Sequence, residues 1–160
     1  MNFESLIKKM TRAAVQGNGA TVADCFTADG VYHDVFYGNF TGRDIARMIE
    51  DYFHRDGENF KWDIFEPVEQ RNMGYASYVF SYDSRLPDFQ EQRAIFEGVA
   101  ICQLRDGRIS DYREVATATT GLALMGYSPD KISRFITRET DVLVKRPEAA
   151  SHLAASTSRS

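Results

Sequence analysis

The sequence is poor in the residues that build disulfide frameworks and metal sites. Its 160 residues include two cysteines and three histidines. Cys25 and Cys102 lie far apart, match no zinc or redox spacing and sit among apolar residues, so we expect reduced, buried thiols. The histidines show no paired spacing, which argues against a metal site. We therefore predict a protein that holds neither a metal nor a cofactor.

The chain also lacks a basic stripe and a long apolar run. Its formal net charge is −4, and lysines and arginines do not gather in one segment, so the electrostatic footprint of a nucleic-acid-binding protein is absent. No apolar run is long enough to span a membrane, and Met1 begins directly on an amphipathic segment without the apolar core of a signal peptide. These features predict a cytoplasmic protein that contacts neither nucleic acid nor membrane.

Aromatic residues are what the chain has in quantity, with 11 phenylalanines and 8 tyrosines. Aromatic side chains bury large areas and a tyrosine hydroxyl also serves a polar pocket, so they suit a ligand cavity, although core packing uses them too. The length fits one domain with one core. We expect this domain over residues 1–146, followed by an Ala/Ser-rich tail, 147–160, that is disordered.

Helical periodicity appears in four segments. Residues 2–16 carry apolar side chains at helical spacing, among them Met10, and Gly17-Asn18-Gly19 ends that helix. Thr21 is expected to cap a short second helix that carries Val22, Cys25 and Phe26. A third helix is expected from Ile45 to Phe53, ending near Gly57, and a last one from Ser128 to Arg146.

Strand patterns follow the second and third helices. An aromatic run, Val31–Tyr37, comes after an Asp29-Gly30 turn, and a loop between Gly38 and Gly42 follows it. Four further strands are expected, with turns at Asn72-Met73-Gly74 and Arg105-Asp106-Gly107, over Phe60–Gln70, Tyr75–Asp83, Ala94–Leu104 and Arg108–Thr117. This order predicts an α+β fold, in which three helices cover the concave face of a curved antiparallel sheet and leave a pocket between them.

Two motifs resemble the nuclear-transport-factor-2-like superfamily, in its branch of SnoaL-like polyketide cyclases, limonene-epoxide hydrolases and ketosteroid isomerases. The first, Phe26 to Ile49, reads FTADGVYHDVFYGNFTGRDIARMI, and the second, Gly98 to Glu114, reads GVAICQLRDGRISDYRE. The resemblance covers residues 3 to 117. It implies a cone-shaped domain whose concave face carries the residues of the site, and it implies a homodimer formed through the convex face of the sheet.

The resemblance and the alternation of side chains along a strand select the same candidate residues. Tyr32 and Asp34 share one face, as do Tyr112 and Glu114, and the resemblance places both pairs on the concave face. Burial and like charge would raise the pKa values of two carboxyls there, which prepares a general acid or base. We predict Asp34, Glu114 and Tyr32 as catalytic residues, and the substrate-binding residues as Tyr112, His33, Met10 and Phe96. His33 points to the opposite face, so a position at the rim or a structural role is expected for it.

Three activities of the family can be compared through these positions. In ketosteroid isomerases the residue matching Asp34 is the base, but the two oxyanion donors fall at Met10 and near Val99–Ala100, which donate no side-chain hydrogen bond. In limonene-epoxide hydrolases Tyr32 and Asp34 match water-orienting residues and Glu114 matches the water-activating acid. Their Arg-x-Asp pair falls near Val79–Ser81, where neither residue occurs, with Asp83 or Arg93 as possible substitutes. The SnoaL-like cyclases require one proton-moving carboxylate, for which Asp34 and Glu114 both qualify.

Two functional hypotheses follow. The first is a cofactor-independent cyclase, isomerase or hydrolase that moves protons on a small apolar molecule, with Asp34 as the leading acid or base and Glu114 as its partner. The second is a non-catalytic ligand-binding or dimerisation module, because this fold hosts unrelated roles. In that case Asp34 caps the loop after its strand and Glu114 is a solvated surface charge.

Overall fold

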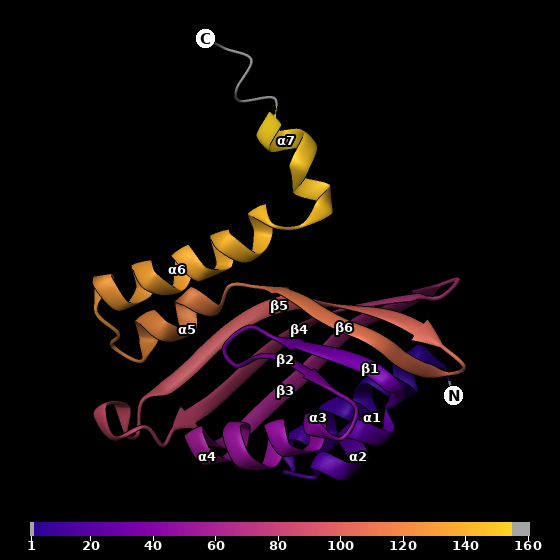
Figure 1. The fold of residues 1–160 in the computed structure, drawn as a ribbon. Coiled ribbons are helices and arrows are strands. Elements are labelled where there is room, and N and C mark those ends of the chain that lie inside the picture. The colour runs from indigo at the N-terminus through magenta and orange to yellow at the C-terminus, as the bar shows by residue number, and fades with distance from the viewer. Residues whose placement is uncertain (1, 155–160) are drawn as a thin grey trace.

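The computed structural model describes residues 2–154, in which six strands form one sheet (Figure 1). The strands are β1 (Phe26–Asp34), β2 (Gly38–Thr41), β3 (Gly57–Gln70), β4 (Met73–Ser84), β5 (Arg93–Arg105) and β6 (Arg108–Ala116). Their order across the sheet is β2-β1-β6-β5-β4-β3, in which β1 and β6 run parallel and all other neighbours antiparallel. The predicted α+β class with a curved sheet is confirmed.

The helices of the first half cover the concave face of this sheet, as Figure 1 shows. They are α1 (Phe3–Val15), α2 (Gly19–Asp24), α3 (Asp44–Arg47), the π-helix η1 (Met48–Phe53) and α4 (His54–Asp56). The apolar stripe of α1, expected from its period, is buried in the main core together with the inward-facing residues of all the long strands. This core lies between the helices and the sheet, so any opening in it is lined by both layers.

The third helical segment is present where the sequence predicts it, but it is not a regular α-helix. Residues 44–56 run as α3, η1 and α4 without interruption, with the π-helical turn in the middle. A π-helix widens the turn by one residue, which shifts the side chains that follow it around the helix axis. The segment ends at Asp56, and Gly57 begins β3.

The start of α2 and of β1 differ from the predictions. Asn18, not Thr21, is the N-cap, because its side-chain oxygen accepts a hydrogen bond from the Thr21 amide at 2.9 Å. Phe26, expected on the second helix, is the first residue of β1, and the expected Asp29-Gly30 turn is an irregularity within that strand. The expected loop between Gly38 and Gly42 contains β2, which pairs with β1.

The two long hairpins illustrate how turn residues set the register. Asp106 and Gly107 both have positive φ angles, 53° and 71°, as a two-residue turn between β5 and β6 requires. The predicted turn at Asn72-Met73-Gly74 is shifted, because β4 already begins at Met73. Gly74 is needed inside the strand, since a Cβ there would lie 2.4 Å from the ring of Phe3 on α1.

The chain after the sheet forms a second, smaller layer. It contains α5 (Ala118–Leu124), which the sequence analysis did not predict, then α6 (Pro129–Val144), the short 3-10 helix η3 (Pro147–Ala149) and α7 (Ala150–Ala154). The expected disordered tail therefore has helical structure over residues 147–154, and its remainder, 155–160, lies outside the described residues. Figure 1 shows α6 and α7 extending away from the sheet. Within residues 2–154, no helix is both long and apolar enough to cross a membrane.

The C-terminal layer packs against the body of the protein through α5 and α6. Gly121 on α5 packs against Phe96 and Ala94 of β5, both of which face the concave side. Phe135, the buried residue of α6, lies 5.5 Å from Phe36, measured between ring centroids. Because Phe36 lies in the turn between β1 and β2, this contact packs α6 against that turn.

Candidate active site

A cavity opens between the concave face of the sheet and the helices. Its empty volume is about 470 Å³, including the space at its open mouth. Ten of its fifteen lining residues are aromatic and three are acidic, and within residues 2–154 no lysine, arginine or histidine lines it. The lining residues are Tyr32, Asp34, Val35, Phe36, Tyr37, Phe53, Asp56, Gly57, Phe60, Trp62, Tyr78, Phe80, Tyr82, Phe96 and Glu114. The chain thus encloses a ring-lined space that carries acidic groups.

Asp34 ends β1 with its carboxylate in this cavity. One oxygen, Oδ1, accepts hydrogen bonds from the backbone amides of Phe36 at 2.8 Å and Tyr37 at 2.9 Å. Among residues 2–154, no hydrogen bond reaches the other oxygen, Oδ2. Burial raises the pKa of Asp34, and the two amide donors oppose that rise. Asp34 therefore both caps the turn after its strand and presents one oxygen to the cavity.

Glu114 on β6 is held in a similar way by phenols. Its Oε2 accepts hydrogen bonds from the hydroxyls of Tyr78, at very short range, and of Tyr112 at 3.3 Å. Burial raises the pKa of Glu114 to about 7, the Tyr78 hydrogen bond opposes this, and the charge of Asp34 adds to it. Its Oε1 accepts no hydrogen bond within the described part of the chain. We call Asp34 and Glu114 together the acid end of the cavity.

The hydrogen bond from Tyr78 to Glu114 depends on a glycine in β5, the strand that lies between β4 and β6. Tyr78 lies on β4 and Glu114 on β6, so the phenol must cross β5 to reach the carboxylate. It crosses over Gly98, where a Cβ would lie 2.6 Å from the Tyr78 hydroxyl oxygen. Sequence analysis missed Tyr78, although strand alternation places it on one face with Phe80 and Tyr82.

Tyr32 and Tyr112 sit behind the acid end. Their rings are 4.5 Å apart between centroids, and their side chains are 3% and 0% exposed. Tyr32 lines the cavity, whereas Tyr112 does not and reaches it only through its bond to Glu114. Burial, followed by the charge of Glu114, raises the pKa values of both phenols, so both stay neutral.

A third carboxylate, absent from the sequence-based candidates, lies at a separate part of the lining that we call the rim, formed by Tyr37 and Asp56. Asp56 Oδ2 accepts the Tyr37 hydroxyl at 2.8 Å, and its Oδ1 accepts Nε of the exposed Arg55 at 2.6 Å. The Arg55 hydrogen bond lowers the pKa of Asp56, against the effect of burial. Asp56 lies at the end of α4, where no alternation rule indicates an inward side chain.

Much of the remaining lining is a continuous group of rings. Phe80 lies 5.1 Å from Trp62, 5.3 Å from Phe96 and 6.1 Å from Phe60, between centroids. Phe96, predicted as a substrate-binding residue, is thus part of the lining. The indole nitrogen of Trp62 is buried and has no hydrogen-bond partner among the described residues.

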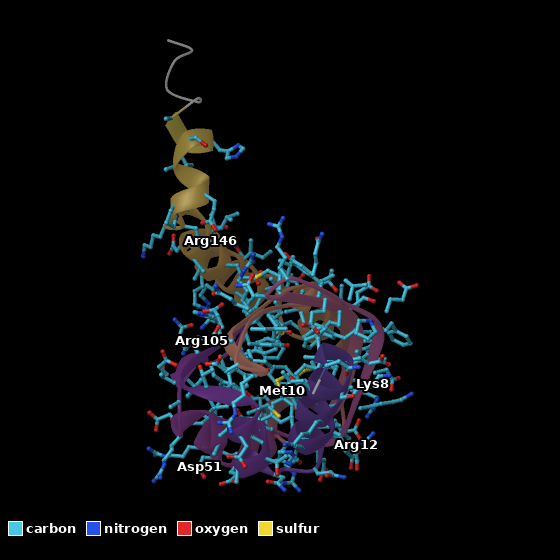
Figure 2. The ribbon with its side chains drawn as sticks, turned by 90° about the vertical axis from the view of Figure 1, so that its right-hand side faces the viewer. Lys8, Met10, Arg12, Asp51, Arg105 and Arg146 are labelled. Atoms are coloured by element: carbon cyan, nitrogen blue, oxygen red, sulfur yellow. The ribbon has the colours of Figure 1, made fainter. Side chains whose placement is uncertain are left out.

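Two predicted substrate-binding residues lie elsewhere. His33 faces the outer side of the sheet, as its alternation implies, where its ring nitrogens lie 2.9 Å from Asn39 Oδ1 and 2.9 Å from Asp111 Oδ2. Met10 is fully buried in the core and is not among the lining residues. Figure 2 shows it pointing inward from α1, while Lys8 and Arg12 on the same helix point outward. Neither His33 nor Met10 touches the cavity, so their predicted contact with a ligand is not supported by the geometry.

The possible substitutes for an Arg-x-Asp pair also lie outside the cavity. Arg93 Nη1 bonds Asp83 Oδ1 at 2.7 Å, but neither residue is among the lining residues. Strand alternation explains this, because Tyr82 points inward and its neighbour Asp83 therefore points outward. The carboxylate constellation consists of Asp34, Glu114 and Asp56 alone within residues 2–154.

Solved structures with the same architecture are numerous. A hypothetical protein with a ketosteroid isomerase-like fold from Catenulispora acidiphila, solved with trimethylamine, is 18% identical with a TM-score of 0.68, over 78% of this chain and 95% of that one. An LEH-like epoxide hydrolase from M. tuberculosis is 16% identical with a TM-score of 0.62, over 76% of this chain and 86% of that one. IdmH from Streptomyces antibioticus, a candidate polyketide cyclase, is 16% identical with a TM-score of 0.64, over 77% and 97%. At these identities the likeness shows a shared fold.

No curated protein matches the sequence. A family model, however, matches residues 7–112, which run from the first helix to the middle of β6 and include Tyr32 and Asp34. That model describes the SnoaL-like domain. Since the match spans more than half of the chain and the architecture agrees with it, this protein belongs to the SnoaL-like domain family, with the NTF2-like fold.

Proposed function

We propose that the protein is a cofactor-independent enzyme that performs acid/base chemistry on a small, largely apolar substrate, of the cyclase, isomerase or hydrolase type. One observation carries the proposal: two carboxylates from different strands each have one oxygen anchored by donors and the other open to an aromatic cavity. Anchoring fixes the position of the group, and the open oxygen leaves a site for proton transfer.

The environments of the two carboxylates favour different roles in proton transfer. Asp34 is the base, since two backbone amides stabilise its ionised form, and its Oδ2 takes a proton from a substrate carbon. Glu114, with a pKa of about 7, is protonated in much of the enzyme at neutral pH. Because its Oε2 accepts two phenol hydrogens, its own proton sits on Oε1, where it is donated to the oxygen that becomes negative as the carbon loses its proton.

The comparisons support an enzyme without selecting the reaction. Two of the similar structures carry enzymatic descriptions, an epoxide hydrolase and a candidate polyketide cyclase. Ketosteroid isomerisation is disfavoured, because Met10 lies outside the cavity and Ala100 has no donor group. Epoxide hydrolysis lacks an acid arm, because Arg93 and Asp83 face away from the cavity. Carboxylate-driven proton transfer at carbon, as in a ring closure, agrees best with the groups that are present.

A generic carbon acid tests the proposal without knowledge of the natural substrate. We expect the protein to accelerate the ring opening of 5-nitrobenzisoxazole, which needs only a carboxylate base in an apolar site. Asp34→Asn should lower this rate by about 100-fold or more while leaving the fold intact. Asp111→Asn, on the outer sheet face, is the matched control and should leave the rate unchanged. An Asp34→Asn variant that turns over like the parent protein would sink the assignment.

The rival hypothesis, a non-catalytic ligand-binding module, makes an opposite prediction for the acid end. In that case Glu114 would titrate like an exposed carboxyl, near its ordinary pKa of about 4.3. NMR titration of carboxyl-labelled glutamate, with Glu114→Gln to identify the resonance, separates the two. A pKa near 7 supports the enzyme, and a pKa below 5 supports the binding module.

We propose that the protein forms a homodimer through the outer face of the sheet. Exposed apolar side chains on β3 to β6 all point to this face, namely Phe65, Val68, Tyr75, Val79, Ile95, Val99 and Val115. A second copy would bury this patch, which is larger than a scatter of single exposed residues. Sedimentation analysis should give a dimer that Val99→Glu converts to a monomer, and a monomeric parent protein would contradict the proposal.

A further inference from the structure

The charge balance of the cavity is one-sided. Three carboxylates line it and no basic side chain does. Asp56 is already paired with Arg55, so its charge is balanced. Asp34 and Glu114 have no such partner, because no cation contributes to the pKa of either carboxyl. The groups that face them are backbone amides, each other, and the phenols of Tyr32 on β1, Tyr78 on β4 and Tyr112 on β6. The acid end therefore holds two potential negative charges without a positive one.

The remaining walls have the chemistry that accompanies cation recognition. Trp62, Phe80 and Phe60 line the same space, and Phe53, which also lines it, stacks on Phe60 at 4.3 Å between centroids. The face of an aromatic ring is electronegative and attracts cations, most strongly in tryptophan, and rings gathered around a space recognise quaternary ammonium groups. Rings and carboxylates thus favour a positive ligand by independent interactions.

From the ring walls and the unpaired carboxylates we infer that the cavity takes substrates that carry a positively charged nitrogen, an ammonium group, on an otherwise apolar body. This deepens the proposed function, and it rests on that proposal only for the statement that the ligand is a substrate. Anionic ligands are disfavoured, because nothing in the lining offers a positive charge. A neutral apolar ligand fills the space but leaves both carboxylates without a countercharge.

The state of Glu114 couples the binding of a cation to pH. Without ligand, burial keeps this carboxyl partly protonated near pH 7. A bound ammonium group shifts part of the Glu114 population to the ionised form, so binding releases a fraction of a proton, and the fraction that stays protonated is the acid of the proposed reaction. Affinity for a cation should therefore increase as the pH rises from 5.5 to 8, whereas affinity for a neutral ligand of the same shape should not increase.

A pair of isosteric probes tests the inference. Choline and 3,3-dimethyl-1-butanol have the same shape, and differ in that a quaternary nitrogen of choline replaces a quaternary carbon. Trp62 is the one tryptophan of the chain and lines the cavity, so its fluorescence reports binding of either probe. At pH 8 we expect choline to bind about tenfold more tightly than the alcohol. Equal affinities, or tighter binding of the alcohol, would overturn the inference.

Substitutions of the two carboxylates test whether they hold the cation. Glu114→Gln and Asp34→Asn should each reduce the preference for choline severalfold, and Glu114→Gln should also remove its increase with pH. Glu97→Gln, which removes an exposed carboxylate from the outer face of β5, is the control and should preserve the preference. If both cavity variants bind choline as the parent protein does, the cation lies elsewhere and the inference fails.

This experiment is separate from the test of acid/base activity, because it measures binding without turnover. Choline preference together with no reaction of 5-nitrobenzisoxazole would sink the proposed enzyme and keep the cation site. The reverse result, turnover without choline preference, would sink the cation site and keep the enzyme.

Discussion

Glu114 and Asp56 line the same cavity and both accept a hydrogen bond from a tyrosine hydroxyl, yet their pKa values move in opposite directions. The donors to Glu114 are the phenols of Tyr78 and Tyr112, both of which are buried, and the charge that acts on it is that of a second carboxylate. At the rim the donor set includes Arg55, whose side chain is 59% exposed. Burial is the main cause of the raised pKa of Glu114, and the hydrogen bond from Arg55 is the main cause of the lowered pKa of Asp56. The comparison therefore attributes the opposite shift at the rim first to this cation.

That difference gives the cavity one acid that can hold a proton near neutral pH and one that stays charged. Groups whose environments separate their pKa values are the usual basis for assigning acid and base roles. In the proposed mechanism Glu114 and Asp34 are the acid and the base, and Asp56 is a fixed charge that accepts hydrogen bonds from Tyr37 and Arg55. Four substitutions test this division.

Glu114→Gln should have the largest effect, on stability as a function of pH. The folded-state pKa of about 7 lies above the unfolded value near 4.5, so the native state binds more protons between those values. Stability linked to this group is present below pH 4.5 and lost as the pH rises through 7, by roughly 3 kcal/mol in total. The variant, which resembles the neutral acid, should keep that stability at pH 8.

Urea unfolding at pH 4.5 and pH 8 measures this effect. Parent protein and Glu114→Gln should agree at the lower pH and differ at the higher one, with the variant the more stable. Glu97→Gln, exposed on the neighbouring strand, should follow the parent protein at both. An unchanged pH slope in Glu114→Gln would mean that Glu114 is not held in a raised-pKa state.

Tyr78→Phe should have the next largest effect. It removes the hydroxyl that lowers the pKa of Glu114, so that pKa should rise above 7. Loss of a hydrogen bond to a charged group should cost about 2 kcal/mol above pH 8 and less at pH 5, where Glu114 is neutral. Carbon-detected NMR of Glu114 gives the pKa directly. Tyr75→Phe, an outward residue of the same strand, is the control, and a shift of the Glu114 pKa there would undermine the assignment.

Asp56→Asn should have a smaller effect and the opposite dependence on pH. The folded-state pKa of Asp56 is lowered, so its contribution to stability is present above the unfolded value and lost as the pH falls through the folded one. Because Arg55 is largely solvent-exposed, the loss at pH 7 should be at most about 1 kcal/mol. Thermal unfolding at pH 7 and pH 2.5 should show a larger difference from the parent protein at pH 7 than at pH 2.5.

The acid end was accessible from sequence because strands obey a period of two. Tyr32 with Asp34, and Tyr112 with Glu114, share faces by that rule, and the family resemblance indicated which face is concave. The register confirms the arrangement, since Tyr32 pairs with Tyr112 across β1 and β6. That pairing joins segments about 80 residues apart, and alternation alone does not predict it.

Other parts of the site depend on three-dimensional contacts that no local pattern encodes. Tyr78 reaches Glu114 only because Gly98 leaves a gap in the strand between them. Asp56 enters the lining after a π-helical turn, which changes the direction of the side chains that follow. The start of α2 was predicted at the wrong residue because Asn18 was assigned to the segment that ends the first helix. Its side chain instead accepts the hydrogen bond that caps α2.

The smallest expected effect, that of Arg55→Gln, tests the comparison most directly. The substitution removes the cation at the rim while Tyr37 continues to donate to Asp56. If the cation decides the ionisation, the pKa of Asp56 should rise to its ordinary value or above it, because burial then acts with less opposition. Arg47→Gln, an exposed arginine on α3 whose partners are Asp44 and Asp51, should leave the Asp56 pKa unchanged. An Asp56 pKa that stays low in Arg55→Gln would assign the effect to the Tyr37 hydrogen bond. Glu114 accepts hydrogen bonds from two phenols and still has a raised pKa. Its difference from Asp56 would then be due to burial and to the neighbouring carboxylate alone.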